Sequence, residues 1–268
     1  MIYIIIGIIL LVLLIIYFYY EDFKLKVTGY NLETKKIQKD YKIIQISDFH
    51  NRKNKWFHKQ VINTIKKEKP DIIVITGDLI DKDDSTYAKE FIKKIYKLSK
   101  IYYVPGNHEY IFGGYPELKD ILIKHNITVL ENNMVSLDNN IDLYGIKDPI
   151  FGMPGDETEV VKRYLDEFNL NEKKYNILLS HRPEQFKNYI NKKFDLVFTG
   201  HAHGGQFILP FIGPVFSPHQ GLFPKYARGI HNKNNTNMIV SRGLGNSLYA
   251  FIRINNRPEL IIVSLLKK

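Results

Sequence analysis

The sequence has no cysteine, and three widespread catalytic motifs are also missing from it. With no Cys among its 268 residues, the chain has no disulfides, thiolate nucleophiles or cysteine-ligated zinc, although this leaves its compartment open. It contains neither a Gly-x-x-x-x-Gly-Lys-Ser/Thr loop nor a Gly-x-Gly-x-x-Gly turn, which disfavours a nucleotide kinase or a nicotinamide-dependent enzyme. The absence of a Gly-x-Ser-x-Gly elbow counts against a serine hydrolase. Function must therefore be sought among carboxylate, imidazole and amide side chains.

Charge is missing from the N-terminal stretch Ile2–Tyr20, which apart from Gly7 consists of Ile, Leu, Val, Phe and Tyr. As a helix it would span roughly 28 Å, close to the hydrocarbon thickness of a bilayer. It ends in an aromatic cluster suited to the headgroup level. We predict a retained single-pass membrane anchor over residues 1–20. The alternatives are a buried core helix and a cleaved signal peptide, and the latter is disfavoured by the lack of a basic n-region and an Ala-x-Ala site.

The membrane face that carries the rest of the chain is left open. Five Lys residues lie between positions 24 and 39, and by the positive-inside rule they would keep the following domain cytoplasmic. A single N-terminal span can equally serve as a signal anchor for an exported domain. We therefore predict localisation at the cell membrane, with either face possible.

The part after the anchor shows no internal division. It has no Pro/Gly/Ser-rich linker, low-complexity tract or repeat. We predict a juxtamembrane segment and first strand region over residues 21–40, followed by one domain over residues 41–268. The net charge of +10 is spread along this part without a block of five like charges. That pattern is typical of a solvated surface, so no nucleic-acid partner is expected, although a diffuse positive field favours an anionic membrane or substrate.

Helical spacing alternates with apolar, β-branched runs in the first half of this domain, and strands dominate the second half. Such a pattern predicts a layered α/β fold with two sheets and outer helices, with ligands at the carboxyl ends of strands. A TIM barrel is the main alternative, but eight regular βα units cannot be counted. The predicted helices are 56–67, 85–98, 116–124 and 158–168, and the predicted strands are 42–47, 71–76, 101–104, 127–130, 141–144, 176–179, 194–198, 238–240 and 260–265.

Five short polar segments each follow the end of a predicted strand. Together they supply carboxylate, imidazole and amide groups, which suit borderline-hard divalent ions such as manganese, zinc or iron. Two such ions about 3.5–4 Å apart form the usual clamp for in-line displacement at phosphorus. The segments are Asp48-Phe49-His50, Gly77-Asp78, Gly106-Asn107-His108-Glu109, His181 and Gly200-His201-Ala202-His203.

The segments differ in how specific each one is by itself. Asp48 and His50 are two residues apart and would point to the same side of an extended strand end. Alternatively, Asp48 caps the next segment and His50 is a surface residue. Asp78 could be a bridging ligand or an ordinary turn residue. His181 indicates a metal site only together with the other segments. The two histidines within residues 200–206 are flanked by glycines, which let backbone and ligand approach closely. Such a pair has little reason to serve a core.

Other groups near these segments are suited to act on a phosphate. Asn107 offers a neutral amide oxygen as a ligand, and His108 could protonate a leaving oxygen or hold a phosphoryl oxygen. Arg52 and Arg182 each follow closely on a segment histidine, so either could bind a phosphate bidentately. Both could instead pair with surface carboxylates.

The order of the five segments resembles that of the calcineurin-like metallophosphoesterases. The later part of the chain is similar to one bacterial branch, in which a membrane anchor or export signal precedes the phosphoesterase domain. UDP-diacylglucosamine pyrophosphatase-like and exported phosphoesterase-like members occur in that branch. The resemblance covers essentially everything after the anchor and implies a four-layer α-β-β-α sandwich. The residues that carry the branch resemblance are 200–206, 209–214 and 241–245.

The resemblance also implies a role for each site residue. A water or hydroxide between two ions would attack phosphorus in line. His108 would stabilise the equatorial oxygens or protonate the leaving oxygen, and Asp81 would orient His108. The two ligand sets would share Asp78 as a bridge, with Asp48, His50, Asp78 and His203 on the first ion and Asp78, Asn107, His181 and His201 on the second.

These observations predict a membrane-anchored, dinuclear metal-dependent hydrolase of phosphoester bonds, a phosphodiesterase or pyrophosphatase rather than a monoesterase. The anchor and the basic surface favour a lipid-linked or cell-envelope phosphate as substrate. Within the enzyme class, the alternative is a broad-specificity or nucleotide phosphodiesterase or phosphatase. A non-catalytic, metal-binding interaction module of the same fold is the alternative outside it. Such a module would be expected to have lost ligands, and all seven are present.

Overall fold

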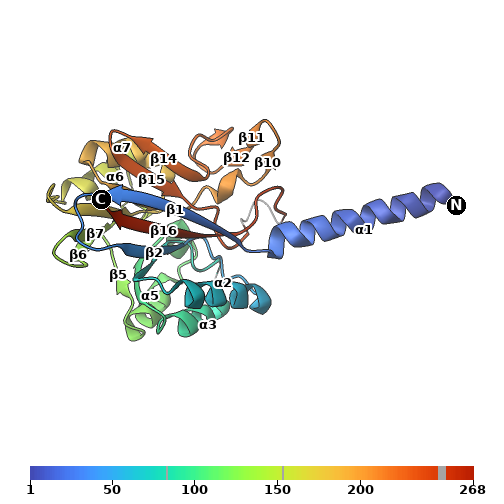
Figure 1. Cartoon of the computed structure of the whole chain (residues 1–268), viewed down its shortest axis with the longest axis horizontal. Coiled ribbons are helices and arrows are strands. Elements are labelled where there is room, and N and C mark those ends of the chain that lie inside the picture. The colour runs from blue at the N-terminus through green and yellow to red at the C-terminus, as the bar shows by residue number, and fades with distance from the viewer. Residues whose placement is uncertain (83, 153, 247–251) are drawn as a thin grey trace.

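A long helix leads into two stacked β-sheets in the computed structural model, which describes residues 1–82, 84–152, 154–246 and 252–268 (Figure 1). The helix, α1 (Ile2–Phe23), projects away from the sheets and is exposed along its apolar length. It is long and apolar enough to cross a membrane, and a signal sequence near an N-terminus meets the same criterion.

The first sheet is mostly parallel and has six strands in the order β1-β16-β2-β3-β4-β5. The pair β16–β2 is antiparallel, and the other neighbours are parallel. Its central strands are apolar on both faces, as expected for parallel strands covered on both sides. The strands are β1 (Lys26–Thr34), β2 (Tyr41–Ile46), β3 (Ile72–Thr76), β4 (Lys100–Val104), β5 (Thr128–Val129) and β16 (Glu259–Lys267).

The second sheet also has six strands, in the order β14-β15-β9-β8-β7-β6. Its central pairs are parallel, and an antiparallel strand closes each edge. Two short antiparallel ribbons, β10–β11 and β12–β13, lie outside both sheets. The strands are β6 (Asn133–Ser136), β7 (Ile141–Gly145), β8 (Tyr175–Leu179), β9 (Leu196–Thr199), β10 (Ile208–Leu209), β11 (Gly213–Pro214), β12 (Phe216–Ser217), β13 (Gly221–Leu222), β14 (Gly229–Lys233) and β15 (Thr236–Val240).

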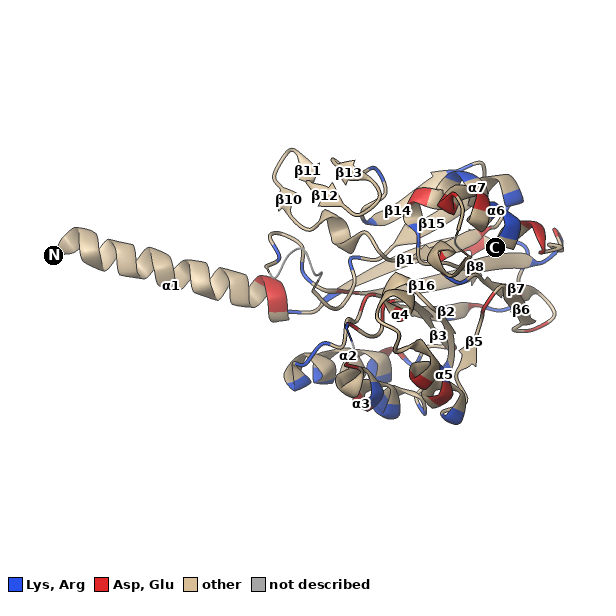
Figure 2. Ribbon diagram, turned by 180° about the vertical axis from the view of Figure 1, so that it is seen from behind, with Lys and Arg blue, Asp and Glu red and all other residues tan. Residues whose placement is uncertain are grey.

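Helices cover the outer face of each sheet, which gives four layers (Figures 1 and 2). Val74 and Phe198 belong to the apolar layer between the sheets. Val61 packs with the outer face of the first sheet and Val161 with that of the second. The first sheet is covered by α2 (Lys55–Glu68), α3 (Thr86–Ile95) and α5 (Tyr115–Lys124), and the second by α6 (Glu157–Asp166) and α7 (Phe186–Lys192); shorter helices are α4 (Asn107–Ile111), η1 (Pro149–Gly152), η2 (Pro183–Gln185) and η3 (His203–Gly205).

The predicted α-β-β-α sandwich is confirmed, and the TIM barrel is excluded by the two separate sheets. Residues 107–109 follow the end of β4 as expected and form the first turn of α4, a helix that was not predicted. The ribbons within residues 208–222, α7, β6 and β14 were also not predicted. The ribbon strands are two residues long, so their sequence is too short to show a period of two.

Candidate metal centre

The five polar segments meet at one end of the sandwich, where strands of both sheets finish. They follow β2, β3 and β4 of the first sheet and β8 and β9 of the second. Hydrogen bonds tie the two sheets together there. Gln45 Nε2 donates to the Thr199 carbonyl oxygen over 2.8 Å, and His181 Nδ1 lies 2.7 Å from the Thr76 carbonyl oxygen. Segments more than 100 residues apart therefore share one buried site.

The first group of candidate ligands consists of Asp48, His50 and His203, all buried, with one donor atom from each within 4.8 Å of the others. His50 Nε2 lies 3.1 Å from His203 Nε2, and Asp48 Oδ1 lies 3.5 Å from His203 Nε2. Asp78 Oδ2 is 3.7 Å from His50 Nε2. The donor atoms of three strand ends thus face one point.

The second group consists of Asp78, His181 and His201, also buried and also within 4.8 Å. His181 Nε2 is 3.2 Å from Asp78 Oδ2 and 3.1 Å from His201 Nδ1. The same oxygen, Asp78 Oδ2, therefore faces both groups. The buried Asn107 begins α4 beside them, and its Oδ1 accepts no hydrogen bond from the described residues.

The charge balance of this site fits a bound cation. The pKa of Asp48 is raised to about 6, mainly by burial, and its Oδ2 has no hydrogen-bond partner among the described residues. Burial lowers the pKa of His181, but the Asp78 carboxylate outweighs it and raises that pKa to about 10. Because His181 Nδ1–H can donate to the Thr76 carbonyl oxygen, its Nε2 is directed at the site as a ligand. A divalent ion would compensate the two carboxylates and leave the imidazoles neutral.

The backbone is strained at most of the candidate ligands. Positive φ is uncommon for residues other than glycine and persists where the surroundings hold it, at a cost of about 1–3 kcal/mol each. Five of the seven predicted ligands adopt it: Asp48 (φ 48°), His50 (47°), Asp78 (53°), His201 (64°) and His203 (47°). This concentration of strain at one strand-end edge is typical of a functional site.

Glycine and glutamate bring the loops of β3 and β4 together. A Cβ on Gly106 would lie 2.2 Å from Asp78 Oδ1, so this close approach requires glycine. Glu109 is fully buried and accepts hydrogen bonds from the backbone N–H groups of Gly106, Asp78, Leu79 and Ile80, over 2.7 to 3.3 Å. We did not predict this clamp. Its sequence signal was an acidic residue three positions after a helix-capping residue.

His108 and Asp81, the predicted catalytic pair, lie together at the rim of the site. His108 Nδ1 is 3.3 Å from Asp81 Oδ1, and His108 Nε2 is 3.9 Å from Asp78 Oδ2. Burial lowers the pKa of His108, but Asp78 and Asp81 outweigh it, so that pKa is raised above its usual value. The ring is thus suited to hold a proton close to the metal ligands.

Arg52 is held by backbone oxygens and aromatic rings. Its Nη1 donates to the Leu244 carbonyl oxygen over 2.8 Å, and its Nη2 donates to the Asp22 carbonyl oxygen at the end of α1. Its guanidinium also lies 4.1 Å from the centre of the Phe57 ring. These contacts favour a structural role, and phosphate binding by Arg52 stays a prediction.

Arg182 is fully buried and surrounded by carboxylates. Its Nε and Nη2 donate to Asp148 over 2.5 and 2.9 Å, and its Nη1 lies 3.6 Å from a carboxylate oxygen of Glu157 and of Glu184. The same Nη1 is 3.3 Å from His201 Nε2. This geometry favours positioning of His201, and direct phosphate binding by Arg182 stays a prediction. Asp148 was missed because it lies outside the five segments.

A cavity of about 700 Å³ adjoins the site at His50 and Asp81. Its wall continues through residues 51–54 to Asp22 and Phe23, the last residues of α1. The candidate centre therefore has a substrate-sized space between itself and the end of the apolar helix.

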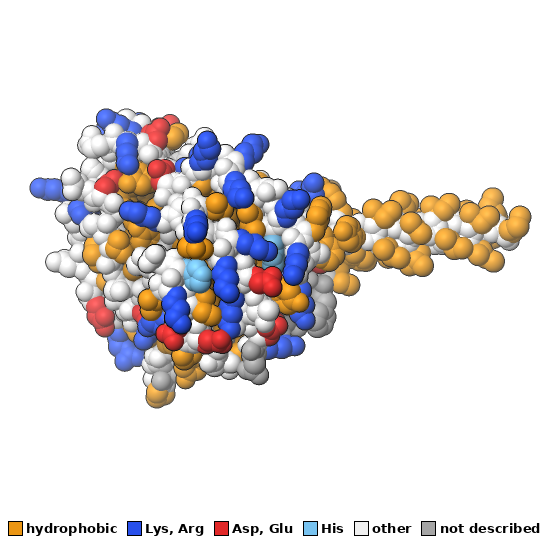
Figure 3. Space-filling view, turned by 90° about the horizontal axis from the view of Figure 1, so that it is seen from below, with side chains coloured by type: hydrophobic (Ala, Val, Ile, Leu, Met, Phe, Trp, Pro, Cys, Tyr) orange, Lys and Arg blue, Asp and Glu red, His pale blue; other side chains and the backbone are white. Residues whose placement is uncertain are grey.

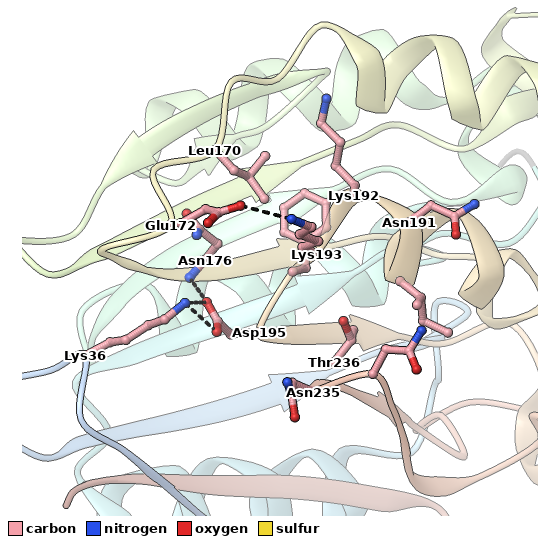
Figure 4. A pocket seen from close by; sticks show the side chains of 13 residues that line it. Lys36, Leu170, Glu172, Asn176, Asn191, Lys192, Lys193, Asp195, Asn235 and Thr236 are labelled. Atoms are coloured by element: carbon pink, nitrogen blue, oxygen red, sulfur yellow. Dashed lines mark hydrogen bonds and ion pairs between the residues drawn. The ribbon is translucent and has the colours of Figure 1, made fainter.

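A second cavity, of about 750 Å³, lies at the amino ends of β8, β9 and β15, away from the candidate ligands (Figure 4). Lys36 contacts both carboxylate oxygens of Asp195 there, and Lys193 pairs with Glu172. Four of its charged groups thus form two ion pairs rather than a ligand set.

An α-β-β-α sandwich with two adjoining carboxylate-imidazole groups that share one aspartate defines a metallophosphoesterase. Residues 41–205 match the profile of the family described as calcineurin-like phosphoesterase, and the chain belongs to this family. It is a phosphoesterase hydrolase with residue groups that can hold metal ions.

Similar proteins occur in several bacteria. A metallophosphoesterase of Aquifex aeolicus is 32% identical over 265 residues, which cover 92% of this chain and 94% of the relative. YkuE, a metallophosphoesterase of Bacillus subtilis, is 29% identical over 262 residues, covering 92% and 87%. The phosphodiesterase YaeI of Escherichia coli is 26% identical over 211 residues, covering 74% and 72%. The solved structure of TT1561 from Thermus thermophilus shares the fold, with a TM-score of 0.54 and 13% identity over 76% of this chain and 90% of that one.

Proposed function

We propose that this protein is a dinuclear metal-dependent phosphodiesterase or pyrophosphatase, held at a membrane by α1 and acting on a lipid-linked or cell-envelope phosphate. The observation that carries the proposal is the position of Asp78 Oδ2, which lies 3.7 Å from His50 Nε2 and 3.2 Å from His181 Nε2. One carboxylate placed between two imidazole groups is suited to bridge two ions. The branch resemblance, with its UDP-diacylglucosamine pyrophosphatase-like members, supports the substrate class.

Each candidate ligand has a place in this proposal. Two bound divalent ions would lower the pKa of a water and polarise a phosphoryl oxygen. Arg182 and the Thr76 carbonyl oxygen orient the imidazoles of the second site, and the Glu109 clamp holds Asp78 in position. The first site would be formed by Asp48, His50, Asp78 and His203, and the second by Asp78, Asn107, His181 and His201.

His108 is proposed to protonate the leaving oxygen. Its Nδ1 lies 3.3 Å from Asp81 Oδ1 and its Nε2 lies 3.9 Å from Asp78 Oδ2, so Nε2 would face a phosphate held at the metal ligands. The carboxylates of Asp78 and Asp81 raise the pKa of this imidazole, which favours the protonated form that a general acid requires. Proton transfer from Nε2 would release the alcohol or phosphate leaving group in its neutral or less charged form.

The apolar, exposed surface of α1 supports membrane anchoring over residues 1–20, with residues 41–268 as the catalytic domain. The Asn256 N–H donates to Glu21 Oε2 over 2.7 Å, and Asn256 Nδ2 donates to the His203 carbonyl oxygen over 2.7 Å. The end of the helix is therefore joined to a candidate ligand loop through one residue. The cavity between α1 and His50 lies where a lipid-linked phosphate would approach.

Metal-dependent hydrolysis of bis-p-nitrophenyl phosphate by the purified full chain tests this function. Metal-free protein should gain activity when manganese, zinc or iron is added, with two ions per chain in the active form. An Asp78→Asn variant should lose about 10³-fold in turnover, because several kcal/mol of charge stabilisation depend on its carboxylate. Asp120→Asn, on the exposed face of α5, is the matched control.

Two results would overturn the proposal. Full activity with fewer than two ions would exclude the dinuclear site. Absence of metal-dependent turnover in folded protein would favour a binding module. A subsequent comparison of nucleotide-sugar lipids, cyclic nucleotides and monoesters separates the envelope substrate from a broad or nucleotide phosphodiesterase.

A further inference from the structure

Large apolar side chains are exposed on the two ribbons that lie outside the sheets. Phe211 is fully exposed, and Ile212, Leu222 and Phe223 are each at least 60% exposed. Leu209 is also exposed. Soluble surfaces rarely gather apolar side chains in this way, and such groups usually mark an interaction site. We call these five residues the apolar tips.

The apolar tips lie at the end of the molecule from which α1 projects (Figures 1 and 2). The Ile208 N–H, at the base of the β10–β11 ribbon, donates to the Ile254 carbonyl oxygen over 2.9 Å. Asn255 Nδ2 donates to the Ile208 carbonyl oxygen over 3.0 Å, and the Asn255 N–H donates to Tyr17 Oη over 3.1 Å. The base of the β10–β11 ribbon is thus linked to Tyr17 of α1 through Asn255.

A further exposed apolar residue, Trp56, flanks α1 at the start of α2. Trp56 is 51% exposed, and Lys53 and Lys55 are exposed beside it. This segment is also tied to the helix, since Gln60 Nε2 donates to the Phe23 carbonyl oxygen over 2.9 Å. Tryptophan next to lysine is typical of a membrane interface.

Basic residues border the same end of the molecule. Arg257 Nη1 donates to Tyr20 Oη over 2.8 Å, and its guanidinium lies 5.1 Å from the centre of that ring. Lys24, which directly follows α1, and Lys225, which follows the apolar tips in sequence, are both exposed. Figure 3 shows Lys and Arg side chains spread over the face seen from below, some of them close to the point where α1 leaves the domain. Cations around an apolar centre match an anionic headgroup layer.

We propose that the apolar tips and Trp56 form a membrane-docking face that enters the interface of the bilayer crossed by α1. This inference rests on the proposed anchoring. A bilayer fits better than a second copy of the chain, because α1 leaves the domain between the ribbons and α2, which carries Trp56, and any occupant must surround the helix (Figure 1). Docking would turn the cavity lined by Phe23 and His50 toward the lipid headgroups, so the substrate phosphate would be bound at the membrane surface.

Spin labels on the full chain test the docking face. Because the chain has no cysteine, a single Cys can be labelled selectively. The variants are Phe211→Cys and Phe223→Cys on the apolar tips and Ile9→Cys within α1. Met134→Cys is the matched control, since Met134 is also an exposed apolar residue but lies on β6 at the opposite end. Each is placed in nanodiscs of phosphatidylcholine and phosphatidylglycerol, one chain per disc.

The measurement is the collision rate of each label with oxygen, which enters lipid, relative to a water-soluble nickel chelate. Docking predicts preferential contact with oxygen at positions 211 and 223, at a depth of about 5–10 Å below the headgroup boundary. Position 9 should lie deeper, and position 134 should be aqueous. Hydrolysis of bis-p-nitrophenyl phosphate by each labelled chain should equal that of the unlabelled chain.

The alternative outcomes are distinct. A lipid-exposed label at position 9 with aqueous labels at 211 and 223 would overturn docking while the anchor stands. An aqueous label at position 9 would overturn both. If the labels at positions 211 and 223 are shielded from the nickel chelate only when each disc holds two chains, the face would be assigned to a second copy and the proposal overturned. Loss of metal-dependent hydrolysis in the unlabelled chain would instead reject the proposed function.

Discussion

The strand-end edge and the apolar tips depart from the usual rule for side-chain burial in opposite directions. At the edge, Asp48, Asp78 and Glu109 are carboxylates with at most 1% exposure. On the ribbons, Phe211 and Phe223 are among the most exposed large apolar residues of the described chain. A buried charge and an exposed cluster of apolar side chains are each unusual and point to a functional or interaction site, whereas exposed charges and buried apolar side chains are ordinary.

The two regions also differ in how they are held. The edge residues are joined across both sheets by hydrogen bonds such as that from Gln45 Nε2 to the Thr199 carbonyl oxygen. Five of the candidate ligands at this edge have positive φ. The ribbon strands are two residues long and lie outside the sheets. The positions of the edge residues are therefore fixed by contacts with both sheets, whereas the ribbons expose their side chains outside the sheets. Substitutions at the edge should impair catalysis, metal binding or stability, whereas substitutions on the ribbons should leave stability unchanged.

The largest of the four effects is expected at His108. His108→Gln should lower turnover about 10²–10⁴-fold, as loss of a general acid does, while both ions stay bound. The loss should be greater for an alkyl leaving group than for p-nitrophenolate, which needs little protonation. His125→Gln, which removes a contact to the Ile121 carbonyl oxygen at the end of α5, is the control. Equal losses on both substrates would show that His108 acts only by binding phosphate.

Glu109→Gln should reduce the free energy of unfolding by about 2–3 kcal/mol. The amide nitrogen of Gln cannot accept the hydrogen bonds that one carboxylate oxygen of Glu109 now accepts from buried N–H groups. Chemical denaturation measures this. In Glu172→Gln, at an exposed ion pair with Lys193, the change should stay below about 1 kcal/mol. Similar values for the two variants would mean that the clamp does not stabilise the edge.

Asp148→Asn should weaken metal binding about 10–100-fold, since Asp148 holds Arg182 against His201 and loss of such outer contacts has effects of that size. Metal titration of folded protein reports it. The control is Asp142→Asn, which breaks another buried carboxylate pair, with Lys174 at 2.8 Å, far from the site. Were the control to lose the same affinity, general destabilisation would be the cause.

Phe211→Ala should change the free energy of unfolding by less than about 0.5 kcal/mol, since the ring is fully exposed. Phe91→Ala should remove about 3–5 kcal/mol, because Phe91 is buried and stacked on Phe49 at 4.7 Å. Thermal or chemical unfolding of both variants in detergent measures the contrast. A large loss at Phe211 would mean that the ribbon belongs to the folded core rather than to a docking face.

Much of the fold could be predicted because its central elements carry local patterns. The buried runs 42–47 and 71–76 and the helical spacing of 56–67 correspond to β2, β3 and α2. The ribbons could not be predicted, since two-residue strands show no period. The pairing of β1 was equally inaccessible, because its register joins Lys26 to Glu259 at the far end of the chain.

The candidate site was predictable in composition but not in geometry. Carboxylate and imidazole groups at strand ends indicate divalent ions by their chemistry alone. The partners of Arg52 and Arg182 required the packed structure, because Asp22 and Asp148 lie about 30 residues from them in sequence. Glu109 was part of a recognised segment, yet its contacts with the backbone of residues 78–80 appear only when β3 and β4 are adjacent.

The sequence by itself determined the donor atoms, their order at successive strand ends and the length of the apolar helix, because these depend on residue type and local periodicity. Tertiary structure alone decided that one oxygen of Asp78 faces both imidazole groups, and that the ribbons with the apolar tips lie at the end of the molecule from which α1 projects. The reason is physical: distances of 3 to 4 Å between residues more than 100 positions apart are set by how sheets, helices and loops pack, and local sequence does not encode that packing.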